Sequence, residues 1–352
     1  MNAPFALGAP AVSPVDLRDP GEVARIDGFV AAHGGTLFHR PAWLRAVEQG
    51  TGQRALGLVA ERHGVLVGWL PLSEVHSPIF GRALVSSGFA VGGGILAEDE
   101  RARAALARAA EECAVRRSCP TVELRGGSLP QGWDVRNDAH LGFVTDLAVD
   151  DEAQLLAVPR KQRAEVRKSR DGELEVRIGR SEADRAMHYA VYAKSVRNLG
   201  TPVFPRGLFD ATLDALEGDI LTVMHRGEPV ASVLSFYHDG AVLPYWGGGT
   251  FAARALRANE RMYFELMLHA RRRGCTRFDF GRSKAGSGPA AYKKNWGFEP
   301  QPLAYASWTA PGAVKRDVDP NSEAYSARIA LWKRLPLAVA NRIGPPIARG
   351  LG

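Results

Sequence analysis

The chain has 352 residues, of which 45% are hydrophobic and 24% are charged. A single hydrophobic core stops growing near roughly 250 residues, so this length predicts two domains of similar size. The composition is that of a globular protein and excludes a long disordered, collagen-like or membrane-bundle sequence. Neither a run of about 18 apolar residues nor a basic segment followed by an apolar run is present. We therefore expect a cytoplasmic protein without a spanning helix.

Lysine and arginine together number 45 against 38 acidic residues, which gives a net charge of +7. This excess favours anionic partners such as phosphorylated small molecules, nucleic acid or a lipid surface. The three cysteines, Cys113, Cys119 and Cys275, contain no C-x-x-C pair, and the nine histidines contain no H-x-x-x-H pair. We therefore expect reduced structural cysteines, no disulfide framework and no metal site.

The first half of the chain predicts strands, a helix and further strands in that order. A turn at 60–64 lies between runs of β-branched and apolar residues, as in a β-hairpin. The triple glycine 92–94 follows, then a helical stretch from Glu98 to Arg117. Cys119 and an alternating strand over 121–126 come next. Strands joined through a crossover helix indicate a mixed sheet covered by helices.

The junction between the halves contains several helix signals. Asp150 or Asp151 is a candidate cap for a short helix, and Pro159 is tolerated in the first turn of the next one. Gly172 then ends that second helix. Ser181, with an acid three residues later, predicts a capping box that opens another helix.

The second half repeats the order of the first. A turn at 224–228 precedes the triple glycine 247–249, a helical stretch from Ala255 to Arg273, Cys275 and a strand over 276–281. The last glycine and the cysteine are 25 residues apart in the first half and 26 in the second. This agreement predicts two copies of one fold, with domains at 1–149 and 150–310. Residues 311–352 are expected to form a tail with an amphipathic helix from about Ser322 to Leu335.

Basic residues concentrate in the second copy. On a helix, four arginines of the segment 159–170 lie at i, i+3, i+7 and i+10 and so share one side. Like charges in a row repel each other, and a bound anion would relieve the repulsion; a solvated face balanced by scattered acids is the alternative. The candidate binding residues here are Arg160, Lys161, Arg163 and Arg167.

A second basic group follows an apolar strand. The segment 281–288 contains Arg282, Ser283 and Lys284 and predicts a glycine-rich turn before a helix, where backbone N–H groups and cations meet an anion. It is not a Walker loop, because the required order of glycines and lysine is absent. Asp279 alternates with two phenylalanines and faces away from them. It either orients or deprotonates an amine, or pairs with Arg277 or Arg282.

Several segments together resemble the FemAB-like proteins associated with PEP-CTERM/exosortase systems. The resemblance is carried by 38–43, 159–163, 243–249, 278–284, 293–300 and 331–342, and so covers nearly the whole chain. It implies an α/β (α+β) fold of tandem duplicated GNAT-like acyltransferase domains, with mixed sheets flanked by helices. The implied reaction is the transfer of an acyl or aminoacyl group to an amine of a peptidoglycan or exopolysaccharide precursor.

The resemblance also implies partners and site residues. The donor would be acyl-CoA or aminoacyl-tRNA, the acceptor a phosphorylated envelope precursor, and no cofactor would be tightly bound. Asp279 and Tyr292 become the candidate catalytic residues, with Tyr245 and Lys293 added to the binding residues. The spacing from Tyr292 to 297–298 is one residue longer than the usual GNAT tyrosine pattern, and the usual acyl-CoA loop is not recognisable in either half.

Two alternatives remain open. One is a non-catalytic protein of the same fold that binds an anionic glycan or RNA through its basic groove. The other concerns the last helical segment, which carries apolar and basic residues and either packs on its own domain or touches the inner membrane peripherally.

Overall fold

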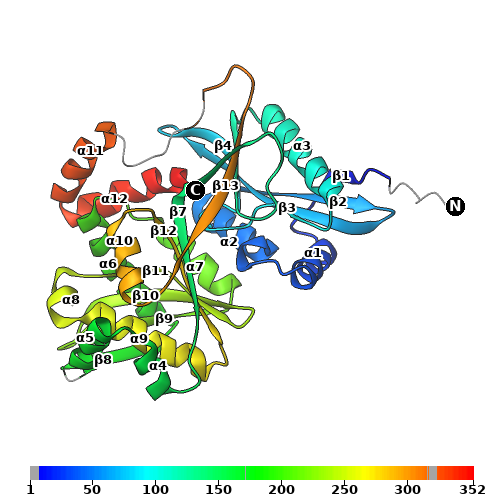
Figure 1. Ribbon diagram of the computed structural model, residues 1–352. Coiled ribbons are helices and arrows are strands. Elements are labelled where there is room, and N and C mark those ends of the chain that lie inside the picture. The colour runs from blue at the N-terminus through cyan, green and yellow to red at the C-terminus, as the bar shows by residue number, and fades with distance from the viewer. Residues whose placement is uncertain (1–7, 171, 315, 317–322) are drawn as a thin grey trace. The chain divides into compact units, whose positions relative to one another are not determined.

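The computed structural model describes residues 8–170, 172–314, 316 and 323–352 (Figure 1). The chain divides into two compact units. In the described residues, the first unit comprises 8–137, 304–314, 316 and 349–352, and the second comprises 138–170, 172–303 and 323–348. The predicted boundary after residue 149 therefore differs from the observed one after residue 137.

The first unit is a mixed sheet with helices on both faces. Its strands lie in the order β1-β2-β3-β4-β6-β13, with β5 paired to β3. Every neighbouring pair is antiparallel except β4 with β6, which is parallel. The strands are β1 (Ala11–Pro14), β2 (Arg54–Arg62), β3 (Val65–Ser77), β4 (Gly81–Ser86), β5 (Leu96–Ala97), β6 (Thr121–Arg125) and β13 (Pro300–Thr309). The helices are α1 (Pro20–Ala32), η1 (Leu37–His39), α2 (Pro41–Thr51), α3 (Glu100–Arg116) and η2 (Arg349–Leu351).

The second unit repeats this arrangement. Its strand order is β7-β12-β11-β10-β9-β8, and only β11 with β12 is parallel. The strands are β7 (Asp134–Asp146), β8 (Leu174–Gly179), β9 (Gly218–His225), β10 (Glu228–His238), β11 (Ala241–Gly249) and β12 (Arg277–Lys284). The helices are α4 (Asp151–Ala157), α5 (Arg160–Arg170), α6 (Glu182–Leu199), α7 (Arg206–Ala215), α8 (Phe251–Leu256), α9 (Ala258–Arg272), α10 (Gly288–Asn295), α11 (Glu323–Arg334) and α12 (Leu337–Ala348). The predicted fold class, mixed sheets flanked by helices in two copies, is confirmed.

The two hairpins confirm the sequence pattern. Both turns place two residues at positive φ, His63 and Gly64 between β2 and β3, and Arg226 and Gly227 between β9 and β10. This conformation matches the right-handed twist of the strands that it joins.

The helix starts at the junction are confirmed as well. The Asp150 side chain accepts a hydrogen bond from the Ala153 N–H at 2.7 Å, and Ser181 with Asp184 forms a capping box. The helix that was predicted over 255–273 is instead two helices, because Arg257 adopts φ 56° between α8 and α9.

The last strands of the two halves are exchanged. Residues 138–146 of β7 belong to the second unit, where β7 pairs with β12 from Asp146 opposite Arg277 to His140 opposite Lys284. Residues 304–309 of β13 belong to the first unit, where they pair with β6. The duplication is visible in the sequence. The sequence pattern does not show which sheet each final strand joins, because successive side chains alternate between the two faces of a sheet in the same way in both strands.

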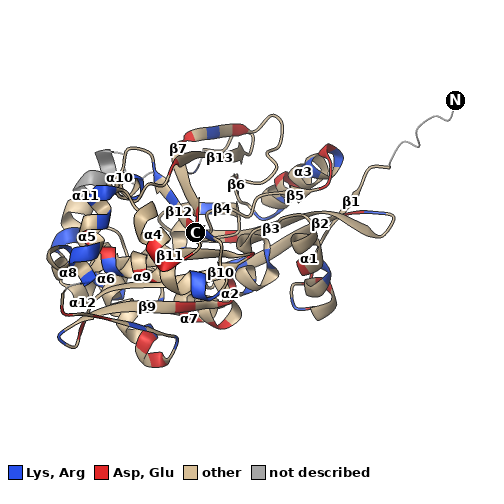
Figure 2. Cartoon of the chain, turned by 60° about the horizontal axis from the view of Figure 1, so that its bottom comes forward, with Lys and Arg blue, Asp and Glu red and all other residues tan. Residues whose placement is uncertain are grey.

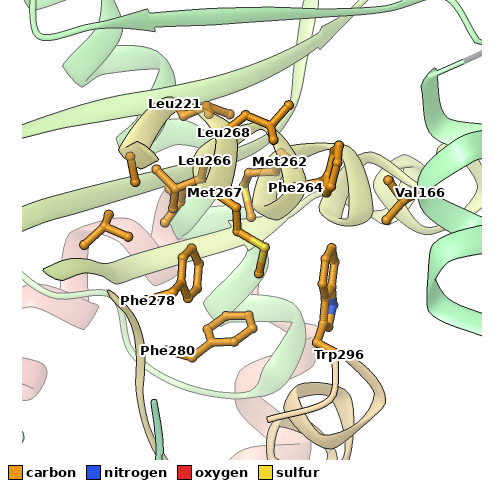
Figure 3. Close-up of a cluster of buried hydrophobic side chains, with 14 of the residues drawn as sticks. Val166, Leu221, Met262, Phe264, Leu266, Met267, Leu268, Phe278, Phe280 and Trp296 are labelled. Atoms are coloured by element: carbon orange, nitrogen blue, oxygen red, sulfur yellow. The ribbon is translucent and has the colours of Figure 1, made fainter. Parts of the chain in front are cut away.

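The second unit has its largest core on the α9 face of the sheet (Figure 3). Phe278 and Phe280 of β12 pack with α9, and Trp296 lies beside Phe264 and Val166. Because successive strand residues face opposite sides, Asp279 is directed away from this core, as predicted. Helix α6 contacts β9, β10 and β11 and covers their other face.

The C-terminal helices α11 and α12 both contact α6 within the second unit. The Arg197 guanidinium donates to the Lys333 carbonyl at 3.2 Å, and a Cβ at Gly200 would lie 2.5 Å from Ile329. The helix predicted from Ser322 to Leu335 corresponds to α11 (Glu323–Arg334), and the predicted first residue, Ser322, lies outside the described residues. The segment 323–348 therefore packs as part of the second unit rather than outside both copies.

The triple glycine of β11 is required by close packing. A Cβ at Gly248 would lie 2.3 Å from Ser195 Oγ and 2.6 Å from Ser195 Cβ on α6, and a Cβ at Gly249 would lie 2.7 Å from the Cβ of Ala253. Neither glycine has a positive φ. Glycine here allows α6 and α8 to approach the end of the strand.

Gly248→Ala should therefore lower the free energy of unfolding by about 1–3 kcal/mol, because the added methyl group overpacks the contact with Ser195. Urea denaturation measures the loss. In the double variant with Ser195→Gly the two effects should be less than additive, since the smaller residue makes room for the methyl group. Gly28→Ala is the control: nothing lies within 4 Å of its Cβ in α1, so stability should rise slightly. Strict additivity of the first pair would contradict the packing explanation.

Candidate active site

The second unit contains an opening between two parallel strands. β11 and β12 pair at only two positions, Ala241 opposite Arg277 and Val242 opposite Phe278. Farther along, Tyr245 is an extra residue on β11, because Leu234 faces Trp246 while the next residue of β10 faces Pro244. Such a bulge bends a strand. In the described residues no backbone hydrogen bond joins the later parts of β11 and β12.

The matching place in the first unit is closed. β4 and β6 also pair at only two positions, but the segment after β4 returns to the end of β6. The Gly94 N–H donates to the Arg125 carbonyl at 3.1 Å, and the Ser128 N–H donates to the Ile95 carbonyl at 2.9 Å. A Cβ at Gly94 would lie 1.9 Å from the Gly126 oxygen. The first copy therefore fills with backbone the gap that the second copy leaves open.

The Asp279 side chain stabilises a bulge in β12, the second of the two strands beside the opening. The register of β12 against β7 shifts between Asp279 and Arg282, and Gly281 has φ +65°. The Asp279 Oδ1 accepts a hydrogen bond from the Gly281 N–H at 2.9 Å. Arg277, one of the two predicted partners, instead donates to Asp239 Oδ2 at 2.9 Å. Among the described residues, the second Asp279 oxygen has no hydrogen-bond partner.

Lys293 ties helix α10 to the same bulge. Its side chain is buried, and Nζ donates to the carbonyls of Gly281 at 3.2 Å and Arg282 at 3.0 Å. The rings of Phe143 and Phe280 lie 5.3 and 5.2 Å from Nζ. The ammonium group is thus enclosed by two carbonyls and two aromatic faces. This geometry makes Lys293 a residue that shapes the site.

Burial changes the proton affinity of both groups. It raises the pKa of the Asp279 carboxyl group, although the Gly281 N–H and the Lys293 charge act in the opposite direction. Burial lowers the pKa of Lys293 to about 8, against the favourable charge of Asp279. A carboxylate with a raised pKa is a better proton acceptor than an exposed one.

Tyr292 lies on the other side of α10. Its hydroxyl group donates to Glu260 Oε1 at 3.4 Å, and its ring packs near Tyr263 and Trp296. Burial raises its pKa well above the usual value, with the Glu260 charge adding to the effect. The phenol therefore stays protonated near neutral pH.

The remaining predicted residues of this region line β11 and β12. Tyr245 is half-buried at the β11 bulge, with its ring 4.9 Å from that of Trp246. Arg282 and Lys284 are half-buried and Ser283 is buried. β12 continues to Lys284, so the predicted glycine-rich turn 281–288 is wrong in its first part. The bulge at Gly281 lets the ladder with β7 resume, and the connection to α10 is 285–287.

Helix α5 is rich in lysine and arginine (Figure 2). Gln162, Val166 and Ser169 are buried, while the predicted arginines lie on the outer side. Acids neutralise part of this surface: Glu165 pairs with Lys168 at 2.9 Å and with Arg257. In the described part of the chain, Arg160, Lys161 and Arg167 have no ion pair within 4 Å. The scattered acids of the solvated alternative are therefore present at Glu165, and the bound anion stays a prediction.

The start of the basic helix α5 contacts the segment that follows α10. A Cβ at Gly297, which has φ +87°, would lie 3.1 Å from Pro159 Cγ. The start of α5 thus adjoins the end of α10, one turn beyond Lys293. Sequence spacing did not indicate this contact, because more than a hundred residues separate the two positions.

A buried polar group between α6 and the sheet is not indicated by the sequence pattern. His188 of α6 is buried and its Nδ1 lies 3.0 Å from Ser232 Oγ, which in turn lies 2.9 Å from Thr222 Oγ1. Burial lowers the pKa of His188 to about 3, so the ring is neutral. A single histidine in a helix carried no signal that it would meet Ser232 and Thr222 on two neighbouring strands.

Within the described residues no cluster of histidine, cysteine, aspartate or glutamate could hold a metal ion. A helix long and apolar enough to cross a membrane is likewise missing from that part of the chain.

Comparisons with known proteins agree with this geometry. Residues 159–294 match the family model described as the acetyltransferase (GNAT) domain. No curated protein matches the sequence. Similar solved structures include FemX, at a TM-score of 0.63 and 14% identity over 84% of this chain and 96% of that one. A tandem GNAT protein from the clavulanic acid biosynthesis pathway has a TM-score of 0.57 and 14% identity, covering 87% of this chain and 100% of its own.

A third similar structure is the C-terminal domain of a putative lysylphosphatidylglycerol synthetase from Agrobacterium fabrum. Its TM-score is 0.57 at 13% identity, over 88% of this chain and 95% of that one. At such identities these structures show the fold. The family match lies in the second unit and spans α5 to α10. The match to the acetyltransferase (GNAT) domain thus lies in the second unit, and the predicted enzyme class, an N-acyltransferase, is confirmed.

The buried Lys293 makes folding stability depend on pH in a defined direction. Its pKa is about 8 in the folded chain and 10.5 when unperturbed, so between these values the unfolded chain binds more protons. Stability must then rise with pH through this window, and the full penalty of burying the charge is present below it. The stability difference between wild type and Lys293→Met should change by about 1.4 kcal/mol per pH unit from pH 8 to pH 10. Urea denaturation at several pH values measures it; a constant difference would show that the ammonium is not desolvated.

Proposed function

We propose that the chain, whose residues 159–294 form a GNAT acetyltransferase domain, transfers an acyl or aminoacyl group to an amine of a cell-envelope precursor. The acceptor class, a peptidoglycan or exopolysaccharide precursor in a PEP-CTERM/exosortase system, rests on the FemAB-like resemblance of the sequence. One observation carries the proposal: the second unit has an opening between β11 and β12, and the carboxyl group of Asp279, whose pKa is raised, lies on β12 beside it.

The chemistry assigned to this opening is acyl transfer to nitrogen. The amine nitrogen attacks the acyl carbon, the new C–N bond forms, and the C–S bond of a thioester or the C–O bond of an ester breaks. The attacking amine loses one proton to Asp279, and the leaving group takes up one proton. Asp279 suits this role because one of its oxygens is fixed by the Gly281 N–H while the other has no partner among the described residues.

Lys293 and Tyr292 act through other groups in this proposal. Lys293 holds the bulge on which Asp279 lies, and Tyr292 anchors α10 to α9 through Glu260. We infer positioning roles for both, since each polar atom is already engaged inside the unit. A proton donor for the leaving group would then come from the substrate complex or from solvent.

The donor is acyl-CoA or aminoacyl-tRNA, and both carry phosphates. The exposed cations of α5 that have no ion pair in the described chain, Arg160, Lys161 and Arg167, are suited to such groups. Arg163 is partly engaged, because its guanidinium donates to the Leu156 carbonyl at 3.2 Å. Tyr245, Arg282, Ser283 and Lys284 would contact substrate along the opening itself. No tightly bound cofactor is part of the proposal.

We also propose that the enzyme works in the cytoplasm, with peripheral contact to the inner membrane through its C-terminal helices. α11 and α12 rest on α6, yet Leu331 is 66% exposed and Val339 is 43% exposed. Cosedimentation with anionic liposomes, comparing the wild type with the Leu331→Glu, Val339→Glu variant, tests this contact; equal binding of the two would contradict it.

Transfer assays with acyl-CoA and with aminoacyl-tRNA test the reaction, using amine-bearing envelope precursors as acceptors. Asp279→Asn should lower turnover on the order of 100-fold or more, because the amide still accepts from Gly281 but no longer takes a proton. Lys284→Ala should also reduce turnover. Both should leave the melting temperature nearly unchanged.

The controls for this assay are surface residues of the same unit. Glu228→Gln and Lys194→Ala remove exposed charges and should retain full activity. Tight, salt-sensitive binding of RNA or an anionic glycan without any product would favour the non-catalytic alternative. Unfolding of both site variants would show that the site is wrongly placed.

The basic face of α5 predicts a separate kinetic effect. Arg160→Gln and Arg167→Gln together should raise the KM for the phosphate-bearing substrate several-fold and leave kcat nearly unchanged, since they remove binding that is equal before and during reaction. The salt dependence of KM should become weaker. Arg108→Gln, an exposed arginine of α3, should change neither. A loss of kcat with unchanged KM would contradict a binding role.

A further inference from the structure

The first unit contains a cavity that plays no part in the proposed reaction. It has a volume of about 560 Å³ and is lined by residues of β1, β2, α2 and α3 and of the segment between β1 and α1. Ligand pockets for small molecules have volumes of roughly 300–1,000 Å³. None of its lining residues belongs to the second unit.

The cavity exists because β1 is shorter than its partner. β1 pairs with β2 only from Ala11 opposite Glu61 to Pro14 opposite Leu58, and one more bond joins the Val15 N–H to the Gly57 carbonyl. The chain then leaves the sheet, so the first residues of β2 lie at an uncovered edge.

That edge is protected against the addition of another strand. Alternate residues of a strand direct their backbone groups to the same edge. The backbone N–H and C=O of Ala55 therefore point to the same edge of β2 as those of Gly57, the edge on which β1 lies farther along. The Ala55 N–H is already bonded to Glu48 Oε1 of α2 at 3.1 Å. A side chain at an exposed edge blocks pairing with a second chain. The space beside β2 is therefore suited to a small ligand rather than to a peptide strand.

The charges around the cavity are unbalanced. Arg18, Arg45 and Arg54 line it, are exposed, and have no ion pair within 4 Å among the described residues. A fourth lining arginine, Arg117, is paired with Glu74 at 2.8 Å. Three arginines that line one concave space without an ion pair in the described chain attract an anion, because Arg binds carboxylates and phosphates through a planar set of donors.

The two acids that line the cavity are bound to backbone groups. Glu48 accepts from Ala55, and Asp16 Oδ1 accepts from the Arg18 N–H at 2.9 Å. Their negative charges still offset part of the field, but two carboxylates face four arginines. The net charge of the residues that line the cavity is therefore positive.

The rest of the lining contains the exposed Gln49 and a smaller apolar part. Leu56 contributes a half-buried side chain to that apolar part, whereas Leu17, Leu58 and Leu72 are buried in the core. A fully hydrated inorganic ion gains nothing from such a surface, whereas an apolar group attached to the anion would bury area there. The lining thus favours a ligand that has both an anionic group and an apolar group.

We propose that this cavity of the first unit is a binding site for a small organic anion, a carboxylate or phosphate attached to an apolar body. The arginines of α2, β2 and the segment before α1 would hold the anionic group, and the half-buried Leu56 would pack against the body. The proposal is independent of the reaction assigned to the second unit.

Cys113 provides a reporter inside the cavity. It lines the cavity and is half-buried, whereas Cys119 is buried and its pKa is raised to about 11 by burial. The rate of alkylation of Cys113 can be measured by peptide mass spectrometry with negatively charged iodoacetate and with neutral iodoacetamide. A positive cavity should raise the ratio of the two rates at Cys113 over that at Cys275 of the second unit by roughly tenfold at low salt.

Variants show which arginines cause the preference of Cys113 for the negatively charged reagent. Arg45→Gln with Arg54→Gln should remove most of that preference without changing the melting temperature, because neither side chain has an ion pair in the described chain. Arg108→Gln on the outer side of α3 should leave it intact. An unchanged ratio in the double variant, or no preference in the wild type, would overturn the proposal.

A ligand probe then tests the apolar part. 1-Naphthyl phosphate should protect Cys113 from iodoacetamide in a saturable way, and inorganic phosphate should protect it at least tenfold less well. Protection should be lost in the Arg45→Gln, Arg54→Gln variant. Equal protection by both phosphates, or none by either, would overturn an organic-anion site; transfer activity of the second unit should be unaffected in every case.

Discussion

The parallel pairing of β11 with β12 at only two residues is the constraint on which the proposed site depends. Parallel strands that separate after two positions leave backbone groups and side chains facing a gap. Two local features bend the strands beside that gap in the second unit: the bulge at Tyr245 and the bulge at Gly281. The gap is thus built by departures from regular strand geometry, and such departures are common at functional sites.

The same constraint has the opposite outcome in the first unit. There the segment after β4 bonds back to the end of β6, and Gly94 and Gly126 touch through backbone atoms. No substrate could enter a space that is occupied by main chain. One fold therefore serves in one copy as a closed support and in the other as an open site, and the difference lies in where each triple glycine packs.

The chemistry of the open site follows from burial. Asp279, Lys293 and the bulge at Gly281 form one hydrogen-bonded group, in which burial raises one pKa and lowers the other. Each charge partly offsets the cost of burying its neighbour. A carboxylate held in this way suits the proton-accepting role proposed for it, and the lysine that fixes it is buried.

The sequence by itself determined the duplication, the two hairpins, the helix caps at Asp150 and Ser181, and the outward direction of Asp279. These features depend on local periodicity and on residues a few positions apart, which a sequence displays directly. The resemblance to FemAB-like proteins added the acyltransferase class. The basic residues of α5 were also visible, because they follow a helical period.

Only the tertiary structure decided which final strand joins each sheet, which copy is open, and what Lys293 and Tyr292 contact. The predicted turn at 281–288 failed for the same reason: pairing with β7 extends β12 to Lys284 although its glycine and charged residues resemble a loop. The contacts that settle these points join residues far apart in the chain. Their energies arise from packing and burial, and neither quantity is defined until the whole unit has folded.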